Sequence, residues 1–441
     1  MQGLVALESA PRLSGLGSLV RYSKRPLQRF EDARSLSPRA TAFQIFAQYH
    51  LVLFDPELIE SVFITDHAAF EKDAFVKDLA QILGQGLLNS EGRQWRRQRK
   101  LTAPSLQRGE ISAYAEQMVA CAEDFLASTP AGRAVDVHAG MMHLTLDILV
   151  KTLFGAEVSR VQEVERALDA VMREYTPLRM TLRTGLPPWF SYASKKRIAR
   201  LRAALDSVVL EVIGQKKQIG TDGSDLLSRM ILSAKSDGGM SDDELRDQTM
   251  TLFLAGHETT ALALTFALRL LSLHPRVADR ARKEVARVVG SRSPSFADIP
   301  ELTYTRAVLD EALRLFPPAW ALARVALTDR ALGDIECKQG TEVIVAPWVM
   351  HRDQRFFSEP ELFRPERWLE KRELPRCVYM PFGAGPRVCI GNHFALTEAI
   401  LVLAVFLARG HFTLENGALL SLTPAITLRP SGPVNMRFER H

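Results

Sequence analysis

The most informative stretch of this chain is Pro381-Phe382-Gly383-Ala384-Gly385-Pro386-Arg387-Val388-Cys389-Ile390-Gly391, a glycine-rich loop that carries one cysteine to the start of a helix. The apolar residues that follow recur at helical spacing from Ile390 to Ala408, and Gly410 is a plausible C-cap. Unpaired backbone N–H groups at a helix N-terminus favour a thiolate. Cys389 is therefore expected to be a nucleophile or a metal ligand.

The residues around Cys389 favour the metal ligand. Gly383 and Gly385 allow the backbone to turn tightly and to lie close to a flat group. A zinc thiolate would need companion ligands at short spacing, as in C-x-x-C. The remaining cysteines lack that spacing, at Cys121, Cys337 and Cys377. One thiolate on one metal, with a macrocycle supplying the other ligands, is the haem-thiolate arrangement.

The pattern F-G-x-G-x-R-x-C-x-G at 382–391 resembles the haem-binding signature of the cytochrome P450 monooxygenases at every defining position. This resemblance implies a mainly α fold with a smaller β-rich region (α+β), with haem b between a long central helix and the cysteine-bearing helix. It makes Cys389 the axial ligand of the haem iron. It also implies that the haem is contacted by Phe382, Gly383 and Gly391.

Length and composition are those of a globular protein. The chain has 441 residues, of which 46% are hydrophobic, and no linker or charge block divides it. We expect one domain over 1–441, with a β-rich part at about 30–70, a long central helix at 241–274 and the haem-binding loop at 381–391. Four unpatterned cysteines indicate a reducing compartment.

No membrane span is expected, because charged residues and proline interrupt the apolar residues of the N-terminus. A soluble, cytoplasmic, monomeric protein of bacterial type is predicted. The net charge of +5 is mildly basic, but no recognition motif supports binding of nucleic acid. The resemblance instead implies a separate ferredoxin or flavodoxin, with a reductase that draws electrons from NAD(P)H.

The first half of the chain contains one further motif of the family. Residues 42–54 predict strands, whereas 75–88 read as a flexible loop and 110–235 as a succession of helices. The resemblance implies that these helices form a lid over the substrate pocket. Trp95 and Arg99 lie on one helical face, and their W-x-x-x-R spacing resembles the pair that binds a haem propionate. Charge alone would favour a solvated basic helix.

A helix that runs unbroken to Pro275 is predicted to begin at the capping box of Ser241 and Glu244. Its centre, Ala255-Gly256-His257-Glu258-Thr259-Thr260, is poor helix material inside an apolar run. The pair His257-Glu258 resembles the start of a zinc-binding H-E-x-x-H, but Ala261 occupies the fifth position. A satisfied polar patch in a core helix is the structural alternative.

The centre of this helix also matches the family's small-Gly-x-acid-Thr motif completely. The resemblance implies that Ala255 contacts the haem and that Gly256 lets the helix open beside dioxygen. Thr259 would hydrogen-bond the iron-bound oxygen, and Glu258 would relay protons from solvent.

The spacing of Glu311 and Arg314 resembles the family's E-x-x-R motif, and Arg367 resembles its downstream arginine. This resemblance implies that the three residues form a buried network that supports the haem-binding loop. Arg324 and Arg387 are further candidates for the haem propionates. His351-Arg352-Asp353 is read as a turn. The resemblance also implies an apolar substrate pocket that includes Leu252, Ala319, Trp320, Leu322, Ala425 and Ile426.

The expected activity is insertion of one atom of dioxygen into a lipophilic molecule of secondary metabolism, by hydroxylation or epoxidation. Two alternatives use the same haem, an oxidase that couples carbons or closes rings without oxygen insertion, and a peroxygenase. A haem-based gas sensor is the non-enzymatic alternative. Fatty acids, terpenes or steroids, and polyketide or peptide intermediates remain open as substrates, and the AGHETT, HRD and FRPERW stretches resemble fatty-acid hydroxylases.

Overall fold

The computed structural model describes residues 12–13, 25–45, 48–130, 132–155, 167, 170, 189–221, 223, 225–234, 239–371, 373–415 and 420–441. Residues 171–188, within the predicted lid, lie outside this set. The chain forms two compact units. The first comprises Met1–Lys77, Leu313–Phe363 and Lys371–Cys389, and the second Asp78–Ala312, Arg364–Glu370 and Ile390–His441. The predicted mainly α fold with a smaller β-rich region is confirmed.

The first unit contains the larger sheet. Its strand order is β1-β2-β3-β9-β6-β4, with antiparallel pairing of β2 with β3, of β9 with β6 and of β6 with β4, whereas β1–β2 and β3–β9 are parallel. The bounds are β1 Arg12–Leu13, β2 Ala40–Ile45, β3 Gln48–Leu53, β4 Phe70–Lys72, β6 Leu322–Ala326 and β9 Glu342–Val345. The strands predicted over 42–54 are therefore β2 and β3. A hairpin joins β7 Arg330–Leu332 to β8 Ile335–Cys337.

The helices of the first unit are short. They are α2 Pro26–Leu36, α3 Pro56–Glu60 and α14 Pro347–Met350. Asp55 caps α3, since its carboxylate accepts a hydrogen bond from the Glu57 N–H at 3.0 Å. α3 continues as a wide turn over Ser61–Thr65.

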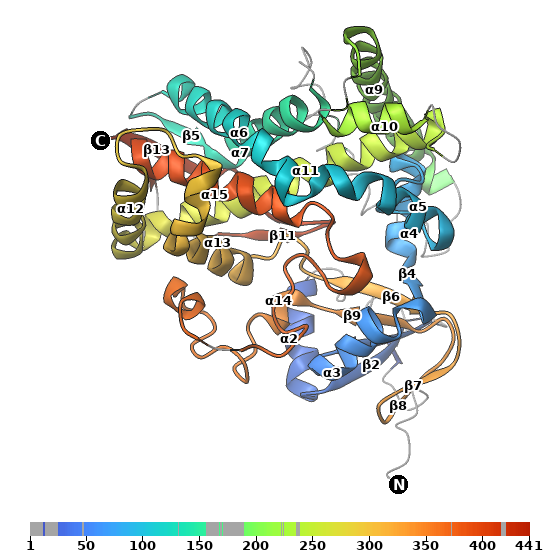
Figure 1. Ribbon diagram of the computed structural model, residues 1–441. Coiled ribbons are helices and arrows are strands. Elements are labelled where there is room, and N and C mark those ends of the chain that lie inside the picture. Colours follow the sequence, from blue (N-terminus) through green and yellow to red (C-terminus); the bar gives the residue numbers. More distant parts are fainter. Residues whose placement is uncertain are drawn as a thin grey trace. The chain divides into compact units, whose positions relative to one another are not determined.

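The second unit is mainly helical (Figure 1). Its helices are α5 Gly92–Thr102, α6 Arg108–Ser128, α7 Val137–Leu149, α9 Trp189–Ile219, α10 Leu226–Ala234, α11 Asp242–Leu273, α12 Pro275–Val289 and α15 Asn392–Arg409. Two further helices, α4 Ala74–Leu83 and α13 Thr303–Leu315, run across the boundary of the units. Small sheets join β10 Gly410–Leu414 and β5 Ala134–Asp136 to β13 Asn435–Arg440, and β11 Leu422–Pro424 to β12 Leu428–Pro430.

α11 is the long central helix of the second unit and contacts α7, α9 and α15 (Figure 1). The predicted capping box is present, because Ser241 accepts from the Glu244 N–H and Glu244 accepts from the Ser241 N–H. Within the described residues, α11 and α15 are long and apolar enough to cross a membrane. Their most apolar windows are 83% and 72% buried, as in the core helices of soluble proteins.

One local expectation needs correction. The tract 75–88, read as a flexible loop, is helical as far as Leu83 within α4, which buries Leu79, Ile82 and Leu83. Gly410 is the C-cap of α15, as predicted, and its N–H donates to the Phe406 carbonyl, although its φ of 167° is extended rather than left-handed. The glycine is required for another reason, since a Cβ there would overlap the carbonyl oxygen of Glu439 in the paired strand β13.

Glu398 lies on α15 and is completely buried, and neither carboxyl oxygen has a hydrogen-bond partner among the described residues. Burial raises the pKa of Glu398 well above its usual 4.5, so the folded protein retains a proton that the unfolded chain releases. The retained proton contributes to the free energy of unfolding. This contribution is fully present below the usual pKa of 4.5 and is lost as pH rises through the raised pKa of the folded protein.

The replacement Glu398→Gln should remove this loss. Relative to the variant, the wild-type free energy of unfolding should fall by about 1.4 kcal/mol per pH unit above the pKa of the unfolded chain. Denaturant titrations at mildly acidic, neutral and mildly alkaline pH measure the difference. Parallel pH profiles for the two proteins would contradict a protonated Glu398.

Candidate functional site

Cys389 closes a compact loop of the first unit. The Cys389 N–H donates to the Phe382 carbonyl at 2.9 Å, and the Val388 N–H donates to the Gly385 carbonyl at 3.0 Å. Between them, Gly385–Arg387 form one tight helical turn. The thiol of Cys389 is exposed at the end of this loop. α15 begins three residues later, with Gly391 as its N-cap.

Two glycines of the loop are required by the backbone. Gly383 and Gly385 have φ +75° and +67°, a region that residues with a side chain rarely adopt. A Cβ on Gly385 would also overlap the carbonyl group of Phe63 in the wide turn after α3. The loop therefore lies directly on that turn.

All four cysteines belong to the described part of the chain, and only Cys389 is exposed. Burial raises the pKa of the other three thiols to about 11 each, at Cys121, Cys337 and Cys377. Among the described residues, no group of three or more His, Cys, Asp or Glu side chains could hold a metal ion. This donor set fits a haem, which takes a single thiolate from the protein, and does not fit a zinc centre.

Arg314 is completely buried in the first unit. Its guanidinium donates to the carbonyl oxygens of His351 at 2.8 Å, Pro360 at 2.7 Å and Leu362 at 3.2 Å. It also lies over the ring of Phe357, 5.2 Å from the centroid. These contacts connect α13 to the chain segment that follows α14.

Glu311 and Arg367 form a buried ion pair in the second unit, with 2.9 Å between Nε of the arginine and the carboxylate. Glu311 also accepts from the Arg364 N–H at 3.0 Å and from Nε1 of Trp368 at 2.9 Å. The two carboxylate oxygens thus hold the turn Pro365–Trp368. Trp368 was not predicted as a member of this network, although it follows Arg367 directly.

The centre of α11 presents one open face. Ala255 is exposed and Thr259 half-buried, whereas the helix is buried on either side of them. The hydroxyl of Thr259 donates to the Ala255 carbonyl at 3.0 Å. The methyl group of Ala255 and the hydroxyl of Thr259 therefore lie on the same face of the helix. The predicted pocket residue Leu252 is buried.

Gly256 and His257 contact α7. A Cβ on Gly256 would overlap the side chain of Leu149, so this glycine allows close packing of the two helices. His257 is fully buried, with Nδ1 2.5 Å from the Phe253 carbonyl, and its own carbonyl accepts from the hydroxyl of Thr145 at 2.9 Å. α11 is an uninterrupted helix at this point, without an opening at Gly256.

Glu258 is held by the hairpin of β11 and β12. Its Oε1 accepts from the Thr427 hydroxyl at 2.6 Å and from Nη2 of Arg429. The carboxylate is 3% and the arginine 13% exposed, so this ion pair is largely buried. Neither partner was predicted, because the two residues are about 170 positions away in a segment without any motif.

The hairpin also brings the predicted pocket residues Ala425 and Ile426 near the centre of α11, next to Thr427. Both are half-buried. Three further predicted pocket residues belong to the first unit, namely Ala319, Trp320 and Leu322. Leu322 lies next to the cysteine loop, because a Cβ added to Gly383 would be 3.9 Å from Cδ1 of Leu322. Trp320 packs on Phe30 at 5.9 Å between ring centroids, and Ala319 precedes it in a half-buried turn.

The predicted propionate ligands occupy both units. In the second, Trp95 is buried and the guanidinium of Arg99 lies 5.8 Å from the centroid of its ring. In the first, Arg324 lies on β6 over the ring of Phe63 at 4.7 Å, and Arg387 ends the tight turn of the cysteine loop. Both are half-buried. α5 also carries exposed basic residues, at Arg93, Arg96 and Lys100.

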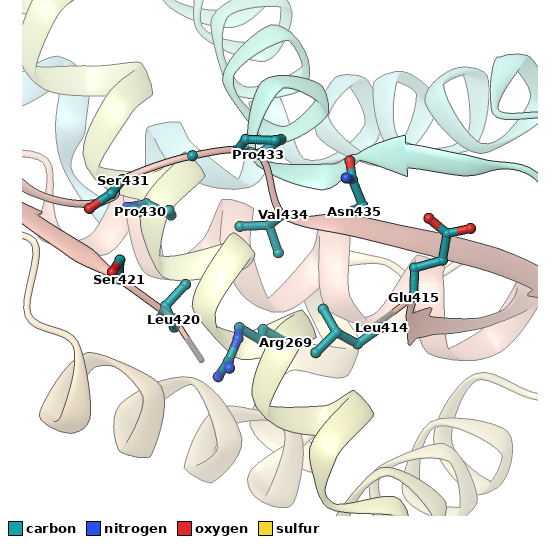
Figure 2. Close-up of a pocket in the computed structure, with 11 residues that line it drawn as sticks. Arg269, Leu414, Glu415, Leu420, Ser421, Pro430, Ser431, Pro433, Val434 and Asn435 are labelled. Atoms are coloured by element: carbon teal, nitrogen blue, oxygen red, sulfur yellow. The ribbon is translucent and has the colours of Figure 1, made fainter. Parts of the chain in front are cut away.

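A cavity of about 380 Å³ opens elsewhere in the second unit, between α11, β10 and the segment 430–435 (Figure 2). Figure 2 shows the lining side chain of Arg269 between Leu420 and Leu414, with Glu415 beyond Leu414. None of the predicted site residues lines this cavity.

Comparison with known proteins gives concordant results. Residues 9–433 match the family model described as Cytochrome P450. Cyclooctatin synthase of Streptomyces melanosporofaciens is 36% identical over 389 residues, covering 86% of this chain and 84% of that relative. Cyclooctat-9-en-7-ol 5-monooxygenase of the same organism is 33% identical over 365 residues, covering 80% and 78%. The crystal structure of the cytochrome P450DA heme domain is similar with a TM-score of 0.88 at 26% identity, covering 100% of this chain and 99% of that one.

The replacement Glu311→Gln should destabilise the folded protein by about 3–5 kcal/mol, because it removes the carboxylate charge that pairs with the buried guanidinium of Arg367. Urea unfolding measures this loss. Glu361→Gln is the matched control, since this glutamate pairs with Arg352 but its side chain is 72% exposed. Equal effects of the two replacements would contradict the importance of the buried pair.

Proposed function

Because this chain belongs to the cytochrome P450 family and is a monooxygenase, we propose that it inserts one oxygen atom into a cyclic lipophilic substrate of the terpene class. The observation that supports this most directly is the exposed thiol of Cys389 on a loop closed by backbone hydrogen bonds. A haem bound through that thiolate supplies the activation of dioxygen and the oxidation of a C–H or C=C bond.

The relatives support the proposed substrate class. Two of them are named for cyclooctatin and for cyclooctat-9-en-7-ol, which is by its name a cyclic unsaturated alcohol. Of the classes left open by the sequence, terpenes or steroids have such skeletons, which fatty acids lack. The apolar residues proposed to contact the substrate fit this class, namely Leu252, Ala319, Trp320, Leu322, Ala425 and Ile426.

The proton path is proposed to run through Glu258 and Thr259. Thr259 lies on the open face of α11, and its hydroxyl, which donates to the Ala255 carbonyl in this structure, is proposed to turn and donate to dioxygen. Within the described part of the chain, Thr427 and Arg429 both donate to Oε1 of Glu258, and Oε2 is the oxygen proposed to exchange the proton. Because general acid–base groups accelerate proton transfer only when they are positioned, the hairpin contacts support this role.

Electrons are proposed to come from a separate ferredoxin or flavodoxin, reduced by a reductase that uses NAD(P)H. The exposed Arg93, Arg96 and Lys100 of α5 provide positive charge that would speed encounter with an acidic partner. We further propose that the protein is a cytoplasmic monomer with the haem propionates bound by Trp95, Arg99, Arg324 and Arg387, and the ring by Phe382, Gly383, Gly391 and Ala255.

The proposal is tested with the purified holoprotein and a panel of cyclic terpene hydrocarbons, cyclic terpene alcohols and long-chain fatty acids. A terpene should convert the ferric haem from low to high spin, and turnover under labelled dioxygen should place one labelled atom in the product. A response to fatty acids alone would contradict the substrate class. An unlabelled coupled or cyclised product would contradict oxygen insertion and favour the oxidase alternative.

The replacement Thr259→Ala should retain the haem but divert reducing equivalents to hydrogen peroxide. Loss of the hydroxyl removes a donor from the proton path, so product formation should fall by at least about tenfold while consumption of NAD(P)H continues. Peroxide and product are quantified in the same reaction. Thr265→Ala is the control, because Thr265 lies on the same helix but is fully buried and bonded to the Ala261 carbonyl. Fully coupled turnover by Thr259→Ala would refute the proposed path.

A further inference from the structure

His351, read from the sequence as part of a simple turn, forms hydrogen bonds with both Arg314 of α13 and Met380, just before the cysteine loop. Its backbone carbonyl accepts from Nη1 of Arg314 at 2.8 Å. Its ring Nε2 accepts from the backbone N–H of Met380 at 3.0 Å. His351 is completely buried and directly follows α14. One residue thus connects the buried arginine of α13 to the chain that enters the cysteine loop.

The Met380 end of this connection leads to the cysteine through two more hydrogen bonds. The Met380 carbonyl accepts from the Gly383 N–H at 3.0 Å. The carbonyl of Phe382, between them, accepts from the Cys389 N–H at 2.9 Å. The position of Met380 therefore influences that of the sulfur-bearing residue.

The N–H of Met380 needs this acceptor. Met380 is only 2% exposed, so water is a poor substitute for the lost partner. A buried N–H without an acceptor is costly, and the chain would shift to find another. The ring of His351 is also confined by Tyr379, with 5.1 Å between ring centroids, so it has little freedom to turn away.

The electrostatic surroundings keep the imidazole ring neutral. Burial, together with the positive charges of Arg314 and Arg352, lowers the pKa of His351 to about 3. Arg352 is itself held close by, since its guanidinium donates to the Leu315 carbonyl at 2.5 Å and stacks on Trp348 at 3.5 Å. At neutral pH the ring can therefore serve as a hydrogen-bond acceptor.

We propose that His351 is a positioning residue for the Cys389 thiolate, acting through the Met380 amide at the entrance of the loop. This inference rests on the proposed ligation of haem iron by Cys389. The buried Arg314 orients the His351 backbone, and the His351 ring orients the loop. Histidine at this position thus acts on the ligand without touching it.

Three replacements separate the acceptor from the volume of the side chain. His351→Gln places an amide oxygen near the position of Nε2 and keeps the acceptor. His351→Leu keeps an apolar volume but removes the acceptor, and His351→Asn is polar but too short to reach the Met380 amide. The matched control is His50→Leu, because His50 is a buried histidine of the same unit that stacks on Phe43 in the sheet.

Two measurements on the holoprotein report the outcome, amide hydrogen exchange of Met380 and the absorption band of the reduced carbon monoxide complex. His351→Leu and His351→Asn should accelerate exchange by about tenfold and convert part of the band to the shorter-wavelength form of a protonated or displaced sulfur. His351→Gln and His50→Leu should match the wild type in both. If His351→Leu does not fold, the comparison of His351→Asn with His351→Gln still tests the role of the acceptor.

The inference is overturned if Leu and Asn behave like the wild type, if Gln is as impaired as Leu, or if His50→Leu produces the same changes. A separate variant distinguishes this failure from failure of the proposed function. Cys389→Ala should abolish the thiolate band while leaving exchange at Met380 slow. A thiolate band that persists in Cys389→Ala would refute the ligand assignment itself, whatever the result at His351.

Discussion

The fold of the first unit depends on satisfying the hydrogen-bond donors of one fully buried guanidinium, that of Arg314. Removing the charge of Arg314 from water is costly unless its donors find acceptors, and α13 offers none, because its own carbonyls are used within the helix. The carbonyls of His351, Pro360 and Leu362 provide them. Satisfying this one side chain therefore determines where two irregular segments run. The loop that carries Cys389 is attached to one of them through the ring of His351.

The second unit meets a related demand at the centre of its longest helix. α11 is buried along most of its length, yet it carries the carboxylate of Glu258 in the middle. A buried carboxylate is tolerated when it is paired and hydrogen-bonded, which Arg429 and Thr427 of the β11–β12 hairpin accomplish. The same hairpin carries Ala425 and Ile426 toward α11. A polar requirement thus positions apolar residues that we propose to contact the substrate.

Glycines serve different purposes in the two units. Gly383 and Gly385 supply backbone conformations that other residues rarely adopt. Gly256 instead removes a side chain where α11 meets Leu149 of α7, and Gly410 does so where β10 meets β13. A glycine in a helix motif can therefore reflect close packing without any opening of the helix. Only the neighbouring chain distinguishes these cases.

The sequence by itself determined the fold class, the thiol and the long central helix with its capping box. These depend on local signals, namely helical periodicity, a capping pair and a loop pattern around Cys389, which short-range physical chemistry makes readable. The tertiary structure alone decided which groups satisfy the buried polar side chains. Arg429 for Glu258, Trp368 for Glu311 and the ring of His351 for Met380 lie far away in the chain or in segments without a motif. A buried charge requires a partner close to it in the folded protein. The position of the charged residue in the sequence does not specify that partner, because the interaction energy depends on distance and burial after folding.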